Sequence, residues 1–200
     1  MNKEGLEKIS YGIYIINTQN SGCIVNTLTR VTNDKIIIAI NKENYTNKML
    51  KENKKFNATV LTKNTDMNII QTFGFTSSKE NNKYKNYKIE KDSNNIPYIK
   101  ENMASLIECE VINEIDLDTH TIFIANVINT QKLSDEEVMT YDYYHKIKKG
   151  ITPPKAPTYE QKTKGYRCTI CGYIYEGKTL PKNFVCPICG APATVFEKID

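Results

Sequence analysis

Four cysteines near the C-terminal end constrain this chain more than any other feature. Cys168, Cys171, Cys186 and Cys189 follow the pattern C-x2-C-x14-C-x2-C. Each C-x-x-C pair places two sulfur atoms on one side of a tight turn, and two facing turns form a tetrahedral metal site. Four thiolates suit iron and zinc alike, so the spacing predicts a metal site with either ion. Because the protein would fill all four coordination positions, no substrate could bind the metal.

The N-terminal residues 1–19 show no apolar signal-peptide core, and no apolar run approaches the roughly 20 residues that span a bilayer. We therefore expect a cytoplasmic protein without a membrane partner, where paired cysteines bind metal or do redox work. The formal net charge is +4. Lys and Glu alternate along the chain and form no basic stripe, which argues against a nucleic-acid partner.

The first 150 residues are dominated by strand-like runs rich in Val, Ile, Tyr and Phe. These runs are YGIYIIN, KIIIAIN, FNATVLT, SLIECEVIN and HTIFIANVI. Helices are expected at about 46–53 and 65–73, and a third after the last strand, where Ser134 and Glu137 fit a capping box. Few helices among many strands predict a mainly β fold, an antiparallel barrel or sandwich with peripheral helices. The phosphate-binding motifs of Rossmann and P-loop folds are missing from the sequence.

A proline-rich segment, KKGITPPKAPTYEQKTKG, separates the strand-rich part from the cysteines. Proline interrupts helices and central strands, so this segment is expected to be an extended, semi-rigid linker. The resulting division is a first domain at 1–150, a linker at 151–164 and a metal domain at 165–200.

Aromatic residues interleave with the cysteines and favour a redox centre shielded from water. They are Tyr166, Tyr173, Tyr175, Phe184 and Phe196. The motifs Y-x-C-x-x-C-G-Y-I-Y-E-G and C-P-x-C-G-A-P resemble the rubredoxin-like domain, especially its short-spacer form in rubrerythrins. That resemblance implies one mononuclear iron per chain, cycling between Fe2+ and Fe3+ as an electron carrier. A structural zinc ribbon is the alternative.

Residues 5–150 resemble the flavin reductase-like, FMN-binding split-barrel family, with its motifs in the same order. NTLTRVT, INKENYTN, FGFTSSKENNKY and DTHTIFIANV match four segments that contact the flavin in that family. The resemblance implies an FMN site formed by Asn26, Thr27, Leu28, Thr29, Asn41, Lys42, Thr46, Lys83 and His120. A helix that begins near Thr46 also suits a phosphate group. The chain departs from the family pattern at Arg30, Ser78, Lys79, Asp118, Thr119 and Ala125.

Several of these residues also have simpler interpretations. Asn26 and Asn41 are typical turn formers, and His120 could be an ordinary hydrogen-bonded strand residue. Cys23 and Cys109 lie in apolar strands and are expected to be buried. No pairing of a nucleophile with a base supports hydrolysis, and we assign no catalytic acid or base.

Taken together, the two halves resemble proteins in which a flavin reductase-like barrel is fused to a rubredoxin domain. This resemblance implies that electrons pass from NAD(P)H, directly or through a reductase, to FMN and then to iron. It also implies a flavodiiron-type acceptor and a homodimer. The alternative is an NAD(P)H:flavin reductase with a structural zinc ribbon.

Overall fold

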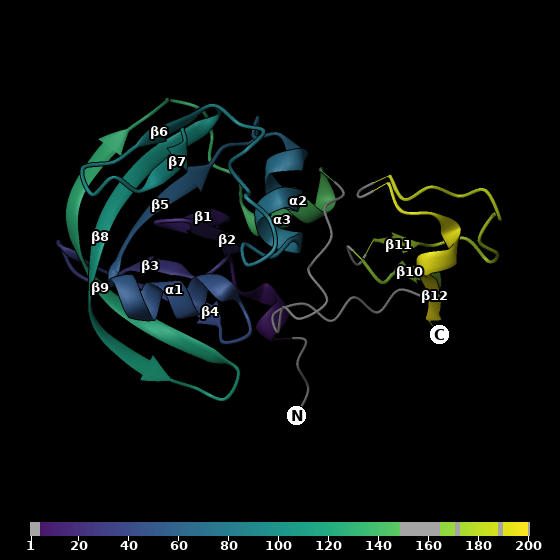
Figure 1. Cartoon of the computed structure of the whole chain (residues 1–200), viewed down its shortest axis with the longest axis horizontal. Coiled ribbons are helices and arrows are strands. Elements are labelled where there is room, and N and C mark those ends of the chain that lie inside the picture. The colour runs from purple at the N-terminus through teal and green to yellow at the C-terminus, as the bar shows by residue number, and fades with distance from the viewer. Residues whose placement is uncertain (1–4, 149–164, 171–172, 188–189, 200) are drawn as a thin grey trace. The chain divides into compact units, whose positions relative to one another are not determined.

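The computed structural model describes residues 5–148, 165–170, 173–187 and 190–199 (Figure 1). Contacts within the chain divide it into a unit at Ser10–Tyr144 and a second unit that holds the C-terminal residues. The expected linker, 151–164, lies outside the described residues, as do Cys171 and Cys189. The two units are described separately below.

A seven-stranded antiparallel sheet forms the larger unit. Its strand order is β2-β1-β5-β8-β9-β4-β3. The strands are β1 (Tyr14–Thr18), β2 (Ser21–Val25), β3 (Leu28–Arg30), β4 (Lys35–Asn41), β5 (Lys55–Leu61), β8 (Met103–Asp116) and β9 (His120–Lys132). A short hairpin of β6 (Ile89–Lys91) and β7 (Pro97–Ile99) stands apart from this sheet. The long strands β8 and β9 curve round the unit (Figure 1), which confirms the expected mainly β, split-barrel fold.

The period-2 pattern of the sequence explains which face of the sheet is buried. In β4, burial alternates along KIIIAIN, and Ile36, Ile38 and Ile40 point into the core. They pack with Phe56 and Phe123 from β5 and β9. Burying a side chain of this size contributes about 1.5 to 3 kcal/mol, so the core accounts for the register of these strands.

Two helices lie where the sequence predicts them. Helix α1 (Tyr45–Asn53) begins at Asn44, whose side chain accepts a hydrogen bond from the Thr46 amide. It packs against β1, β2, β4 and β5, and ends at Lys54 in the left-handed region, with φ 58°. Helix α2 (Met67–Phe75) begins at Asp66, which caps it in the same way, and packs on β2.

The third expected helix does not begin at Ser134. The Ser134 hydroxyl donates to the Met103 carbonyl oxygen, and the Glu137 carbonyl oxygen accepts the Lys63 amide, so both residues serve tertiary contacts. The predicted capping box is therefore wrong. Helix α3 (Tyr141–Lys146) starts seven residues further on, and the short η1 (Leu6–Lys8) lies near the N-terminus.

The C-terminal unit has a small three-stranded sheet in the order β11-β10-β12. It consists of β10 (Gly165–Cys168), β11 (Ile174–Tyr175) and β12 (Phe196–Ile199), with the short helix η2 (Ala193–Val195) before the last strand. Gly165 has φ +150°, and a Cβ there would lie 2.2 Å from the Tyr175 carbonyl oxygen. Only glycine lets these two strands approach so closely.

Candidate flavin and metal sites

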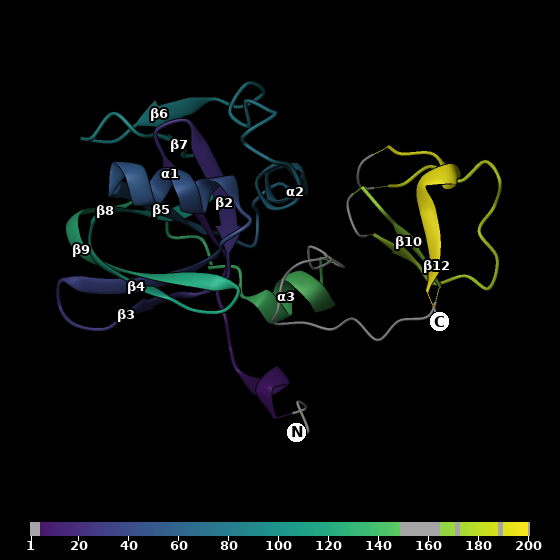
Figure 2. The ribbon, with the colours of Figure 1, turned by 60° about the horizontal axis from the view of Figure 1, so that its bottom comes forward.

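Seven of the residues expected to bind FMN lie in β3, β4 and β9 or in the segments that adjoin these strands. They are Asn26, Thr27, Leu28, Thr29, Asn41, Lys42 and His120. Strand β3 pairs with β4, and β4 pairs with β9, so these three strands are neighbours (Figure 2). The Thr27 carbonyl oxygen accepts the Ala39 amide at 3.4 Å, which places the loop at 26–29 beside the end of β4. Asn41, the last residue of β4, is the direct cross-strand partner of His120. The structure therefore brings Asn41, Lys42 and His120 together, while Leu28 and Thr29 pair with Ile38 and Ile37 further back along β4.

The turn between β8 and β9 holds His120 in place. The Leu117 amide donates to the His120 carbonyl oxygen at 2.8 Å, and the Lys42 amide donates to the Thr119 carbonyl oxygen at 3.0 Å. On the side chains, Thr119 Oγ1 lies 2.8 Å from His120 Nδ1. Partial burial lowers the pKa of His120 below its ordinary value, because the charged form loses hydration. His120 is therefore mostly neutral at pH 7.

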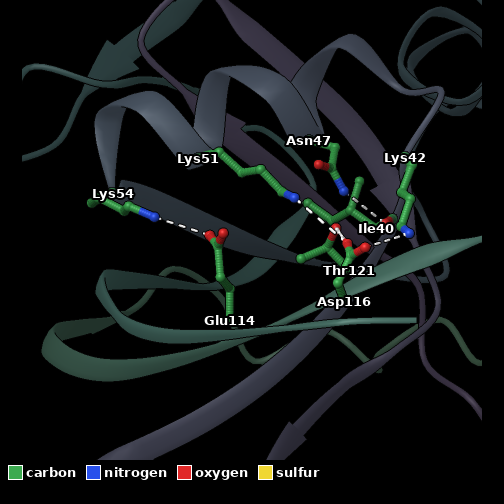
Figure 3. A network of polar contacts seen from close by, with 8 residues as sticks. All are labelled: Ile40, Lys42, Asn47, Lys51, Lys54, Glu114, Asp116 and Thr121. Carbon is green, nitrogen blue, oxygen red and sulfur yellow. Dashed lines mark hydrogen bonds and ion pairs between the residues drawn. The ribbon is translucent and has the colours of Figure 1, made fainter. Parts of the chain in front are cut away.

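A network of ion pairs joins Lys42, which precedes α1, and the C-terminal end of α1 to the end of β8 (Figure 3). Asp116 Oδ2 lies 2.6 Å from Lys42 Nζ, and Asp116 Oδ1 lies 3.6 Å from Lys51 Nζ. One turn further along, Lys54 Nζ contacts Glu114 Oε2 at 2.9 Å. These groups are exposed, so each pair contributes little to stability. The Lys42 hydrogen bond holds the pKa of Asp116 below its usual range, so Asp116 stays ionised and compensates the charge of Lys42.

The other two candidate residues, Thr46 and Lys83, are buried. The Thr46 hydroxyl lies 2.8 Å from the Ser21 hydroxyl and is fully buried. Lys83 is 4% exposed, and its Nζ donates to the carbonyl oxygens of Gly22 at 2.7 Å and Phe73 at 3.0 Å. Both side chains thus fix the start of β2, which leads directly into the loop at 26–29. Their contact with a flavin stays a prediction.

The loop after α2 is fastened to the same strand. Ser78 Oγ accepts the Gly22 amide at 3.2 Å and donates to the Gly22 carbonyl oxygen at 3.3 Å. Sequence reasoning missed this anchor, as well as Asp116, because both are contacts between residues far apart in the chain. The Asn44 cap carried a readable signal, since it is an Asn directly before a helical pattern.

Cys23 and Cys109 are buried, as the sequence predicts. They are 1% and 0% exposed. Burial raises the pKa of Cys23 to about 11 and that of Cys109 to about 12. Both thiols therefore stay protonated at neutral pH, in the state of an unreactive small hydrophobic side chain.

The cysteine site shows the same backbone pattern in its two halves. The Cys168 amide donates to the Tyr173 carbonyl oxygen at 2.8 Å, and the Cys186 amide donates to the Ala191 carbonyl oxygen at 2.8 Å. Each bond spans five residues and encloses one C-x-x-C pair. Cys168 and Cys186 are both buried, and Gly190 adopts the left-handed region with φ +71°. The predicted ligands Cys171 and Cys189 lie outside the described residues.

Aromatic side chains gather in the cysteine unit, as the sequence predicts. The ring centroids of Tyr175 and Phe184 lie 4.8 Å apart, and those of Phe184 and Phe196 lie 5.4 Å apart in an edge-to-face arrangement. Tyr173 stacks on Phe184 at 6.2 Å. These contacts supply the core of a unit too small to bury a large aliphatic core.

The donor groups present fit the two expected cofactors. Two buried cysteines in matching turns suit a thiolate-bound metal, and the amides, hydroxyls and imidazole along the barrel edge suit the polar rim of a flavin. Within the described ranges no set of three or more His, Cys, Asp or Glu side chains gathers, and the four-cysteine site stays a prediction. None of the helices described here is long and apolar enough to cross a membrane.

Comparison with known proteins assigns both parts of the chain to known families. Residues 6–150 match the flavin reductase like domain, and residues 166–197 match the rubrerythrin, rubredoxin-like domain. The barrel is similar to Streptomyces globisporus C-1027 NADH:FAD oxidoreductase SgcE6, with a TM-score of 0.63 at 17% identity over 69% of this chain and 85% of that chain. At that identity the likeness shows the fold alone.

The barrel and the cysteine unit define an oxidoreductase of the flavin reductase-like family with a C-terminal rubredoxin-like domain, and the chain belongs to that family. Over its full length it is 32% identical to the High molecular weight rubredoxin of Moorella thermoacetica, with all of both chains covered. It is also 37% identical to the Ferric-chelate reductase (NAD(P)H) of Archaeoglobus fulgidus, over 80% of this chain and 98% of that protein. The expected fusion of a flavin reductase-like barrel with a rubredoxin domain is confirmed.

Proposed function

We propose that this protein passes electrons from NAD(P)H, directly or through a separate reductase, by way of FMN to a mononuclear Fe(Cys)4 centre. The observation that supports this most strongly is that one chain carries a flavin reductase-like barrel and a rubredoxin-like domain. NAD(P)H gives up two electrons together, whereas a single iron accepts one. A bound flavin supplies the missing step, because it exchanges electrons in pairs or singly.

In this proposal the protein's own residues bind and orient the FMN. The loop at 26–29, together with Asn41, Lys42 and His120, forms the polar edge that holds the ring and its phosphate. Thr46 and Lys83 support that edge from within, through Ser21 and Gly22. No side chain is assigned as a catalytic acid or base, so the residues act through binding and orientation.

The metal centre takes Cys168, Cys171, Cys186 and Cys189 as ligands and holds iron in our proposal. With four protein thiolates, its chemistry is limited to accepting and releasing one electron. Residues 1–150 form the flavin domain, residues 151–164 the linker and residues 165–200 the metal domain. A cytoplasmic location follows, since thiolates of this kind need a reducing compartment.

The electron acceptor in our proposal is a redox partner such as a flavodiiron protein. A homodimer is also part of the proposal. Ile112 and Ile115 in β8, Leu117 in the turn after it, and Ile128 on β9 are each about half exposed. Exposed apolar side chains along two neighbouring strands favour a protein contact. Light scattering should then give about twice the chain mass of 22.9 kDa.

One alternative retains a specific observation in its favour. The chain is similar over 80% of its length to a protein named Ferric-chelate reductase (NAD(P)H), and four thiolates also suit zinc. The protein would then be an NAD(P)H:flavin reductase with a structural zinc ribbon.

Metal and flavin analysis of protein purified without oxygen separates these two functions. The proposal predicts a red protein with about one iron and one FMN per chain. Zinc in place of iron after growth in iron-rich medium would support the reductase and exclude the electron-transfer role of the cysteine site. Zinc-supplemented growth is the control, because an Fe(Cys)4 site accepts zinc when iron is scarce.

A further inference from the structure

Thr119 occupies a fixed position in the turn between β8 and β9. Its carbonyl oxygen accepts a hydrogen bond from the Lys42 amide at 3.0 Å. The carbonyl oxygen of the next residue, His120, accepts one from the Leu117 amide at 2.8 Å and closes the turn. His120 is also held in register with Asn41 on β4. Since the backbone is pinned on both sides, the side chains of Thr119 and His120 have a defined relative position.

Within that turn the Thr119 hydroxyl lies 2.8 Å from His120 Nδ1. Among the described residues it is the hydrogen-bond partner of the imidazole. A hydroxyl can donate or accept, and the imidazole nitrogen is the more basic acceptor of the two atoms. The favoured arrangement is therefore an O–H donated by Thr119 to Nδ1, which leaves the ring proton on Nε2.

The charged groups around the turn do not oppose this arrangement. The Asp116 carboxylate is directed to the α1 side, where it contacts Lys42, Lys51 and the Thr121 hydroxyl (Figure 3). Thr121 and His120 are consecutive strand residues, so their side chains point to opposite faces. The Asp116 carboxylate is thus compensated by two lysines on the other face of the strand.

Two further acidic residues flank the turn, and neither offsets the burial of the imidazole. Asp118 is exposed, and Glu43 lies just beyond Lys42, where its amide donates to Asn41 Oδ1. Burial alone sets the direction in which the pKa of His120 moves, which is downward. The hydroxyl and the burial therefore act together in favour of the uncharged ring.

We propose that Thr119 is a positioning residue that holds His120 as the neutral tautomer with its proton on Nε2, ready to donate a hydrogen bond at the flavin edge. The inference rests on the proposed function for the identity of the group that receives this bond. It also gives a role to a departure from the family pattern, which has an Asp in place of Thr119. A carboxylate there would favour the charged imidazolium, whereas the hydroxyl favours the neutral ring.

The test is nitrogen NMR of the full-length protein labelled with [15N]histidine. The chain has two histidines, and a His145→Gln variant assigns both signals. The proposal predicts that the neutral form of His120, observed at pH 8, carries its proton on Nε2, with Nδ1 unprotonated. A proton on Nδ1 at this pH would overturn it.

A series of variants at position 119 separates positioning from a merely structural role. Thr119→Ser retains the hydroxyl and should leave the pKa of His120 unchanged. Thr119→Val should raise that pKa by about 0.5 to 1, because a hydrogen bond to the neutral form is lost. Thr119→Asp should raise it by about 1 to 2. An unchanged pKa of His120 in both the Val and the Asp variants contradicts the proposal. If either variant unfolds, the tautomer measured in the wild-type protein and in the Ser variant still tests it.

Adding FMN to the same labelled protein tests the proposed function separately. Movement of the His120 signals and not those of His145 supports a flavin at this edge. If the His120 signals do not move, the proposed position of the flavin beside His120 is wrong. The tautomer of His120 and its dependence on Thr119 are decided separately, by the measurements without added FMN.

Discussion

Lys83 Nζ donates a hydrogen bond to the carbonyl oxygen of Gly22 at 2.7 Å, and the side chain is buried where α2 packs on the edge strand β2. Burial lowers the pKa of Lys83 to about 8 from its ordinary value of 10.5. Cys23, the next residue in β2, stays protonated at neutral pH and provides no full negative charge to offset the ammonium. The fold thus tolerates a buried cation that two backbone carbonyl oxygens solvate.

This burial predicts a stability that rises with pH relative to a Lys83→Met variant. Between pH 8 and 10.5 the folded protein has already released the Lys83 proton, while the unfolded chain still holds it. The free energy of unfolding of the wild type, measured against Lys83→Met, should therefore increase by up to about 3 kcal/mol across this range. Urea denaturation at several pH values measures it. Cys23 titrates in both proteins, so its effect largely cancels, and a difference independent of pH would contradict the prediction.

Gly22 and Gly74 provide a matched pair of substitutions. A Cβ on Gly22 would lie 2.8 Å from Phe73 Cε1, 2.8 Å from Tyr84 Oη and 2.9 Å from Asn17 Oδ1. Gly22→Ala should therefore lower the free energy of unfolding by about 1 to 3 kcal/mol. Gly74 lies in α2, and a Cβ there meets Ile24 at an ordinary 3.6 Å, so Gly74→Ala should raise it by about 0.5 to 1 kcal/mol. Denaturant titration measures the free energy of unfolding of both variants. Equal changes in the two would contradict the close packing around Gly22.

The ion pairs in Figure 3 predict an effect on flavin affinity. Asp116→Asn removes the carboxylate that compensates Lys42 and leaves its charge free to attract an anionic FMN phosphate. The dissociation constant of FMN should fall by about 3-fold at low salt, and less at high salt, because these groups are exposed. Glu114→Gln is the control, since it frees Lys54 at the C-terminal end of α1, the opposite end from Lys42. Fluorescence titration measures both, and an equal response in the two variants would argue against a phosphate near Lys42.

Metal content tests the cysteine assignment without reference to activity. Cys168→Ser and Cys186→Ser should each reduce the bound iron well below one per chain, because a three-thiolate site is open to water and loses metal readily. Cys109→Ala is the control: Cys109 is buried in the barrel and should retain full metal occupancy. Elemental analysis gives the answer, and full occupancy in either Ser variant would remove that cysteine from the ligand set.

Sequence patterns predicted the strands best where burial follows strict alternation. KIIIAIN in β4 and HTIFIANV in β9 are examples, since each exposes one face to the core. The pattern missed β2, whose SGCIV sequence is buried almost throughout and contains a glycine required by packing against Phe73. Local signals also misplaced the third helix, because Ser134 found its partner in a strand thirty residues away.

The two candidate sites also differ in how far local sequence signals predict them. Candidate metal ligands such as Cys168 and Cys186 can be predicted from spacing alone, because the C-x-x-C pattern is local in sequence. The inward direction of Lys83 was not predictable, because its partners Gly22 and Phe73 come close only after the sheet has formed. The pairing of Asn41 with His120 likewise depends on the register of β4 against β9.

The most direct test of the electron path is anaerobic stopped-flow mixing of the full-length protein with NADH, or with NADH and a reductase. Flavin and iron absorbance are followed separately. Our account predicts that the flavin is reduced first and the iron second, and that Cys168→Ser retains the first phase and loses the second. Iron reduction that proceeds equally fast in flavin-free protein would contradict it.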